Sequence, residues 1–144
     1  MGPLSWSAGL IPAARLAAEG QVAFLIDAEG PTDRFSLIHP RASAVELEEL
    51  PLGEDAFWQE KEALNCLIHL KCPYLRLQGS IDHVHGSMEL HARRALAATS
   101  LGEGAWFSGS LYEHGTEILK LLKDFILKSC SDKVHSHSDH KTLR

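Results

Sequence analysis

The sequence predicts an α/β protein with three layers, in which a short, mainly parallel sheet is flanked by helices. Short apolar runs bounded by glycine or turn residues are typical of strands that are buried on both faces. In this chain such runs alternate with segments of helical periodicity. That alternation is the pattern of crossover connections around a parallel sheet. We expect three strands, with room for a fourth.

Three segments are predicted as strands. Residues 21–27 (QVAFLID) form an almost continuous apolar run that is followed by the turn-rich AEGPTD. Residues 73–78 (PYLRLQ) form a second such run, which ends at Gly79. A weaker third strand is predicted over residues 105–108 (AWFS), between two glycines.

Four segments between and around these strands are predicted as helices. Residues 8–19 are alanine-rich. A second helix follows Asp55 and should end before Pro73, because a residue that precedes proline disfavours the helical conformation. Ser87 is predicted to cap the helix MELHARRALAAT. Thr116 is predicted to cap EILKLLKDFILK, which carries an apolar stripe at helical spacing.

A chain of 144 residues has the size of one domain. We expect that domain to cover residues 1–128. Within it, residues 28–54 are predicted as a loop or a lid-like segment, because they are long and acidic toward their end. Residues 129–144 are polar and contain histidines, and we expect them to form a disordered tail.

Charge and composition exclude several classes of protein. The net charge of -5 does not support a nucleic-acid partner, which usually requires a basic surface. The sequence contains no apolar run long enough for a membrane span, and it does not begin like a signal peptide. We therefore expect a cytoplasmic protein. The three cysteines, Cys66, Cys72 and Cys130, lack metal-ligand spacing and are expected to be reduced.

In an open parallel sheet, functional side chains gather past the carboxyl ends of the strands. The stretch SWSAG holds Ser7 before a predicted helix and approximates G-x-S-x-G, with Ser5 in place of the first glycine. Asp82 follows the second predicted strand, and His114 follows the third. Each residue alone has a plainer explanation in a helix start, a turn or a cap. Together they give a nucleophile, an acid and a base in one chain order.

That order and the surrounding residues resemble a known family. From SWSAGLIPAARLA through LIDAEGPTD and CPYLRLQGSIDHVHG to EHGTEILKLLKDFIL, the sequence resembles the C-terminal half of an α/β-hydrolase of the prolyl-oligopeptidase or dienelactone-hydrolase kind. The resemblance covers nearly all of residues 4–128. It implies a Ser7 nucleophile, with Asp82 orienting the imidazole of the base His114. It also implies an oxyanion donor at the backbone N–H of Ala8, and acyl transfer on an ester or peptide substrate without a cofactor.

The resemblance begins at the nucleophile, so we expect a truncated chain that is weak or inactive alone. Only residues 1–4 precede the turn, and Pro3 cannot donate to a sheet. The second oxyanion N–H of the family comes from a loop after an earlier strand. Without further strands, the strand at 21–27 is expected to be an exposed edge. A missing N-terminal half or a second copy could dock there.

Several alternatives stay open at this stage. Asp27, at the end of the first predicted strand, is an alternative acid. A non-catalytic remnant that serves as an interaction or assembly module is the alternative function. A metal-binding function would use His83 and His85 or the tail histidines, but no third ligand is evident beside the first pair, so we assign no metal site. These histidines are predicted to be polar turn and tail residues.

Overall fold

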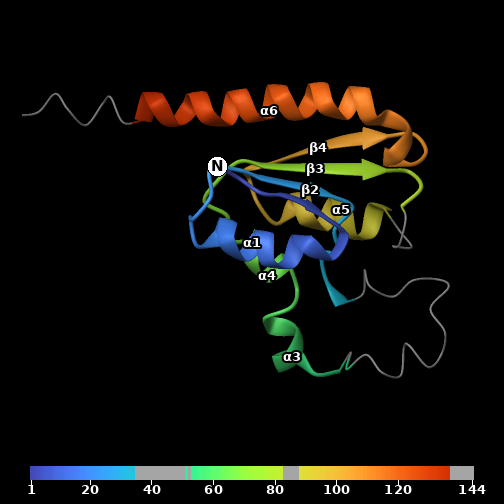
Figure 1. Ribbon diagram of the computed structural model, residues 1–144. Coiled ribbons are helices and arrows are strands. Elements are labelled where there is room, and N and C mark those ends of the chain that lie inside the picture. The colour runs from blue at the N-terminus through green and yellow to red at the C-terminus, as the bar shows by residue number, and fades with distance from the viewer. Residues whose placement is uncertain (35–50, 52, 83–87, 137–144) are drawn as a thin grey trace, which may run out of the picture.

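A computed structural model of the chain describes residues 1–34, 51, 53–82 and 88–136. The middle layer is a four-stranded parallel sheet with the order β1-β2-β3-β4, and helices cover both of its faces (Figure 1). The strands are β1 (Leu4–Trp6), β2 (Leu25–Ala28), β3 (Tyr74–Gly79) and β4 (Gly102–Phe107). The predicted α/β class is confirmed, and the fourth strand is present.

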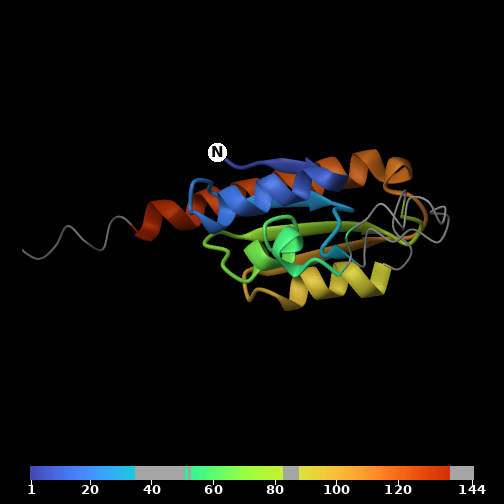
Figure 2. The same cartoon turned by 90° about the horizontal axis from the view of Figure 1, so that it is seen from below.

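Seven helical segments lie among the described residues. They are the 3₁₀ turn η1 (Ser7–Gly9), α1 (Leu10–Ala18), α3 (Asp55–Gln59), α4 (Leu64–Leu67), α5 (Met88–Ala97), the 3₁₀ helix η3 (Leu111–His114) and α6 (Gly115–Ser136). Helices α1, α4 and α5 lie on one face of the sheet, and α6 lies on the other (Figure 1, Figure 2).

The sheet is buried on both faces because its central strands alternate toward two apolar clusters. The cluster beneath α1, α4 and α5 includes Leu10, Leu25, Leu67, Tyr74 and Ala95. The cluster beneath α6 includes Phe24, Ile26, Leu75, Leu77, Phe107 and Phe125. All residues of β2 and β3 are buried, as the apolar runs predict.

The first residues of the chain form a strand, which corrects one expectation. Leu4 and Trp6 of β1 stand opposite Ile26 and Ala28 of β2 in a parallel pairing. Pro3 cannot donate a hydrogen bond, but its carbonyl accepts one from the N–H of Ile26 at 3.0 Å. The prediction that the strand at 21–27 is the exposed edge is therefore wrong. Among the described residues, β1 and not β2 is the edge strand at this side of the sheet.

The helix predicted after Asp55 is divided into α3 and α4. The N–H of Leu64 donates to the carbonyl of Thr32 instead of continuing the helical ladder. The Glu62 carboxylate lies in the break and accepts from the backbone and the guanidinium of Arg34. Contacts with the loop after β2 thus interrupt the helix. Of the predicted loop at 28–54, residues 35–50 and 52 lie outside the described residues, as does the predicted cap Ser87.

Helix α6 begins and ends at positions that differ from the prediction. It begins at Gly115, one residue before the predicted cap Thr116, because η3 leads directly into it and is itself capped by Ser110. It runs on to Ser136, past the boundary expected at residue 128. Ser129 follows Phe125 by one helical turn, and both are buried, so the inward stripe continues beyond that boundary.

Phe125 anchors α6 to the sheet, since its ring packs edge-to-face on Phe24 with 6.1 Å between the ring centroids. We expect Phe125→Ala to lower the free energy of unfolding by about 3–5 kcal/mol, as for other buried aromatic truncations. Urea denaturation measures this change. Leu119→Ala is the matched control, because Leu119 lies on the same helix and its side chain is 68% exposed. Equal losses in the two variants would contradict the assigned packing of α6.

Candidate active site

Ser7 occupies a sharp turn between β1 and α1. Strand β1 ends at Trp6 in an extended conformation, and Ser7 then adopts a φ of 52°, in the left-handed region. In the described part of the chain, Ser7 shares this region with one other non-glycine residue, Glu29. Such a conformation costs on the order of 1–3 kcal/mol and concentrates at functional sites. A strained serine between a strand and a helix is the geometry of a nucleophile elbow.

The turn brings the neighbours of Ser7 close to each other. A Cβ atom at Gly9 would lie 3.6 Å from the Cβ of Ser5, which is an ordinary van der Waals contact. Ser5 itself is buried and donates its hydroxyl to the carbonyl of Ile26 at 3.2 Å, so a serine is accommodated where the motif has glycine. Ala8 is exposed on the second position of the turn. The first N–H groups of a helical turn have no partner within it, so the Ala8 amide can serve an oxyanion.

Asp82 lies just past the end of β3, and its side chain is 3% exposed. Its Oδ2 atom accepts a hydrogen bond of 2.9 Å from the Gln78 amide. The same oxygen lies 3.4 Å from Nε2 of His91, which comes from α5. The carboxylate is thus held at the end of the sheet by one strand and one helix.

His114 closes η3, past the end of β4. Its Nε2 atom lies 2.7 Å from the Ser108 carbonyl, its Nδ1 atom lies 3.2 Å from the Glu117 carboxylate, and its ring packs on Phe107. The Ser108 carbonyl raises the pKa of His114 above its ordinary value, and the Glu117 carboxylate adds to this increase against partial desolvation. Two acceptors beside one imidazole favour its protonated form.

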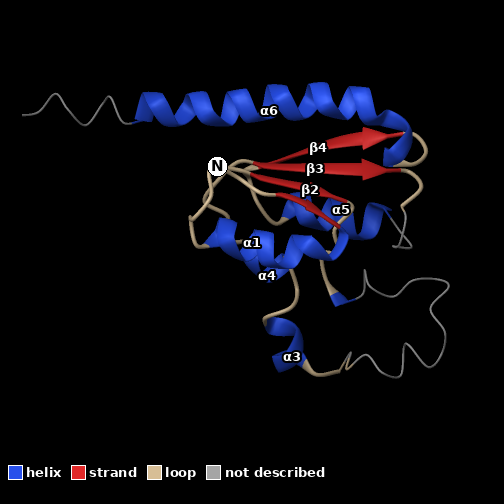
Figure 3. Cartoon of the chain, in the orientation of Figure 1, coloured by secondary structure: helices blue, strands red, loops and turns tan. Residues whose placement is uncertain are grey.

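The three predicted residues lie at the carboxyl end of the sheet, but no hydrogen bond joins them into a triad. The four strands are parallel, so their carboxyl ends lie at the same end of the sheet (Figure 3). Ser7, Asp82 and His114 follow β1, β3 and β4 in the sequence. The elbow and η3 are in contact, since the rings of Trp6 and Tyr112 are 5.3 Å apart. Within the described residues, no hydrogen bond links His114 to Ser7 or to Asp82.

Asp27, the alternative acid, lies inside β2 rather than past its end. Its carboxylate is fully buried and pairs with the guanidinium of Arg76. It also accepts hydrogen bonds from the Tyr74 hydroxyl at 3.2 Å and from the N–H of Gly30 at 3.1 Å. Burial raises the pKa of Tyr74 well above its ordinary value, and the Asp27 charge adds to this increase. These contacts tie Asp27 to neighbours within the layer beneath α1.

Glu29 is a residue that the sequence did not single out. It follows β2 directly, its φ is 53°, and it is 1% exposed. Its Oε1 atom accepts from the N–H of Gly79 at 3.1 Å. A Cβ at Gly79 would lie 2.9 Å from that oxygen and 2.7 Å from the Gly109 carbonyl, so glycine is required there. In the sequence, Glu29 lies within the turn-rich stretch AEGPTD, which gives no sign of a buried carboxylate. Its position one residue past a strand is the one signal that could have indicated it.

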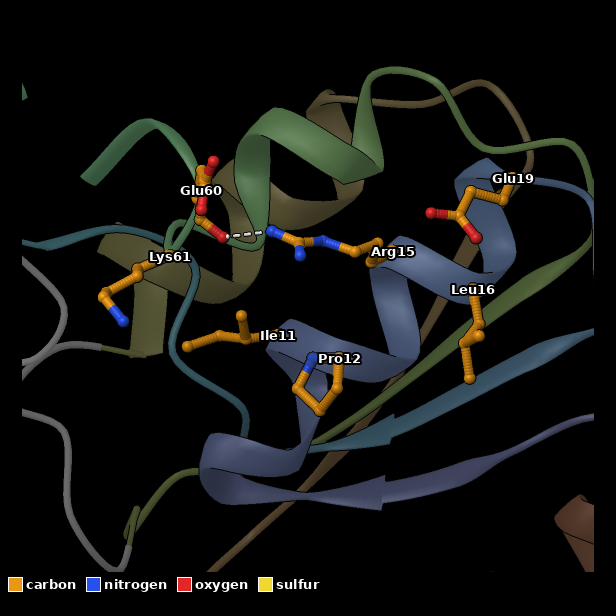
Figure 4. Close-up of a pocket in the computed structure, with 7 residues that line it drawn as sticks. All are labelled: Ile11, Pro12, Arg15, Leu16, Glu19, Glu60 and Lys61. Atoms are coloured by element: carbon orange, nitrogen blue, oxygen red, sulfur yellow. Dashed lines mark hydrogen bonds between the residues drawn. The ribbon is translucent and has the colours of Figure 1, made fainter. Parts of the chain in front are cut away.

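A cavity of about 410 Å³ lies beside the outer face of α1 (Figure 4). Its lining consists of Ile11, Pro12, Arg15, Leu16, Glu19, Glu60 and Lys61. The Arg15 guanidinium reaches across to the Glu60 carbonyl at 2.9 Å. None of the three candidate residues lines this cavity, so it is separate from the site at the strand ends.

Among residues 1–34, 51, 53–82 and 88–136, no group of three His, Cys, Asp or Glu side chains could hold a metal ion. His83, His85, His137 and His140 lie outside the described residues. The three cysteines lie among the described residues and form no disulfide, and Cys72 is buried. No helix in the described chain has the length and apolar character needed to cross a membrane.

No family model and no curated protein matches the sequence, but solved structures match the fold. A crystal structure of Paleococcus ferrophilus monoacylglycerol lipase is similar with a TM-score of 0.59 and 15% identity, over 89% of this chain and 69% of the lipase chain. A puromycin hydrolase complexed with PGG is similar with a TM-score of 0.52 and 18% identity, over 72% of this chain and 17% of the hydrolase chain. The fold that the sequence implied is confirmed, since the chain is similar in fold to part of each of these two hydrolase structures.

Proposed function

We propose that this chain carries a serine hydrolase site in which Ser7 is the nucleophile. The observation that carries the proposal is the left-handed Ser7 at a strand-to-helix turn, at the carboxyl edge of a parallel sheet. A strained conformation of this kind persists only where the surrounding structure enforces it. Pairing of β1 with β2 on one side and α1 on the other provides that enforcement.

In the proposed reaction, Ser7 Oγ attacks the carbonyl carbon of an ester or peptide while His114 accepts its proton. The bond to the leaving group breaks as His114 returns that proton to it. Water then attacks the acyl carbon as His114 accepts its proton, and the bond between that carbon and Ser7 Oγ breaks as His114 returns the proton to Oγ. Asp82 stabilises the imidazolium, and the N–H of Ala8 donates to the oxyanion.

His114 must change position for this chemistry. Its ring nitrogens contact the Ser108 carbonyl and the Glu117 carboxylate. Rotation of its side chain from these acceptors toward the elbow would release a nitrogen for Ser7. The contact between Trp6 and Tyr112 supports this step, because it keeps η3 against the elbow. Hydrogen bonds between catalytic groups often tighten only once substrate is bound.

We expect the proposed site to react slowly. Ala8 is the oxyanion donor that we assign among the described residues, whereas α/β-hydrolases also use an N–H from a loop after an earlier strand. Loss of one oxyanion donor costs about 10²–10³ in kcat. A slow reaction with an activated acyl or phosphonyl reagent is therefore the expected signature.

A fluorophosphonate probe tests the nucleophile. We expect slow covalent labelling of the folded protein and no labelling of Ser7→Ala, because the probe reacts with an activated serine hydroxyl. Labelled peptides identified by mass spectrometry give the site. Ser5→Ala is the matched control in the same turn and should retain labelling. A folded wild-type protein that stays unlabelled would contradict the proposal.

The resting contacts of His114 predict a pH dependence. Since the Ser108 carbonyl and the Glu117 carboxylate raise its pKa, these contacts contribute their full stability below the ordinary histidine pKa of 6.5. This contribution is lost as the pH rises through the higher pKa of the folded state. Glu117→Gln should lower the pKa of His114 in an NMR titration. The control Glu103→Gln, on β4, should leave it unchanged, and an unchanged pKa in Glu117→Gln would refute the assigned contact.

A second candidate function, assembly through the sheet edge, is favoured by β1. Leu4 and Trp6 are 60% and 41% exposed, and β2 is the neighbour of β1 among the described residues. An edge strand of this kind is a template for pairing with another strand. We propose a second copy of the chain or a separate strand-bearing segment as the partner.

Sedimentation equilibrium tests this assembly. We expect a concentration-dependent increase in mass that Leu4→Lys abolishes and Ser7→Ala preserves, because charge on an edge strand opposes pairing. A wild-type protein that stays monomeric at all concentrations would exclude self-assembly.

A further inference from the structure

Four polar side chains are buried together between the sheet and α5. Asp27, Arg76 and Gln78 lie on neighbouring positions of β2 and β3 and are 0% exposed. His91 from α5 is 1% exposed. Buried polar groups of this kind are costly unless they are matched to one another. Gln78 and His91 connect this buried group to Asp82.

Arg76 determines which way the Gln78 amide points. The guanidinium can only donate hydrogen bonds. Its Nε and Nη2 atoms lie 3.2 Å and 2.6 Å from Oε1 of Gln78. The amide oxygen of Gln78 therefore faces Arg76, and its amide nitrogen faces Asp82 Oδ2 at 2.9 Å.

Arg76 also determines the tautomer of His91. Its Nη2 atom lies 3.1 Å from Nδ1 of His91. Because Nη2 only donates, Nδ1 must accept, so the proton of the neutral ring is on Nε2. That nitrogen is buried and lies 3.4 Å from Asp82 Oδ2, facing the carboxylate in a geometry that forms no hydrogen bond.

The position and charge of Arg76 are fixed from its other side. Its Nη1 atom pairs with the Asp27 carboxylate and donates to the Gly30 carbonyl at 2.7 Å. Arginine does not release its proton in proteins. Arg76 is therefore a donor to its neighbours at every pH at which the protein is folded.

We propose that Arg76 fixes the hydrogen-bond polarity of Gln78 and His91, so that both present an N–H to Asp82 and act as positioning residues for the acid. This inference rests on the proposed function, in which Asp82 orients His114. The network connects the buried ion pair of Asp27 and Arg76 to the Asp82 carboxylate at the carboxyl end of the sheet. His91 is the member for which two variants can separate positioning from packing.

Two variants of His91 distinguish its two nitrogens. His91→Gln can place an amide nitrogen near the Nε2 position and so keep the donor to Asp82. His91→Asn keeps an acceptor near the Nδ1 position, toward Arg76, but cannot reach Asp82. We expect the rate of fluorophosphonate labelling at Ser7 to stay near the wild-type rate in His91→Gln. In His91→Asn it should fall about 10-fold, the lower end of what an N–H beside a charged group is worth, because Nε2 and Oδ2 are 3.4 Å apart and not hydrogen-bonded.

A spectroscopic measurement tests the polarity without any activity. The ¹⁵N chemical shifts of the His91 ring in the full chain should show a proton on Nε2 and a lone pair on Nδ1 in the neutral form. Gln78→Ala should leave this tautomer unchanged, because Arg76 sets it directly. A proton on Nδ1 in the wild-type protein would overturn the inference.

The two measurements separate the failure of this inference from that of the proposed function. Equal labelling rates in His91→Gln and His91→Asn, with unfolding free energies measured for both, would show that His91 only packs and would overturn its positioning role. If the wild-type protein is not labelled, the proposed function fails and the positioning role fails with it. The ¹⁵N shifts alone then decide the polarity of the network.

Discussion

The parallel pairing of β1 with β2 is the constraint on which the candidate site depends. It is short, with Leu4, Ser5 and Trp6 opposite Ile26, Asp27 and Ala28. It fixes the direction in which the chain leaves the sheet. Because α1 must then return over the face that holds Leu25 and Tyr74, the connection is too short for a relaxed turn. The left-handed Ser7 absorbs the change of direction. The strained conformation of Ser7 and its place between β1 and α1 therefore share one cause.

A second constraint is the buried ion pair between Asp27 and Arg76, which stand directly opposite each other on β2 and β3. A buried pair is not strong evidence for stability, because its desolvation can offset its attraction. It does specify register, since a shift of one residue in either strand would move the charge of that strand to the apolar face beneath α6 and leave the other charge buried without its partner. It also supplies the fixed cation from which the polarity of Gln78 and His91 follows.

The sequence predicts the elements better than it predicts their contacts. The apolar runs that end at Asp27 and Gln78 identify buried strands, and the ends of the second and third predicted strands lie before Asp82 and His114. The strand before Ser7 has no such run and is not predicted. Periodicity does not show that Arg76 inside PYLRLQ faces Asp27, because that match depends on the register between two strands. Nor does it show Glu29, whose burial depends on the close approach of Gly79 and Gly109. The contacts of His114 with Ser108 and Glu117 follow from one side-chain rotation, which no local pattern encodes.

The fold and the elbow lead to one central claim, that Ser7 is a nucleophile served by His114. A crystal structure of the protein after reaction with a small phosphonate tests it most directly. We predict phosphorus bonded to Ser7 Oγ, a phosphonyl oxygen within hydrogen-bond distance of the Ala8 N–H, and the His114 ring turned from Ser108 toward Oγ. An adduct on another residue, or one on Ser7 with His114 still bound to Ser108 and Glu117, would contradict the claim.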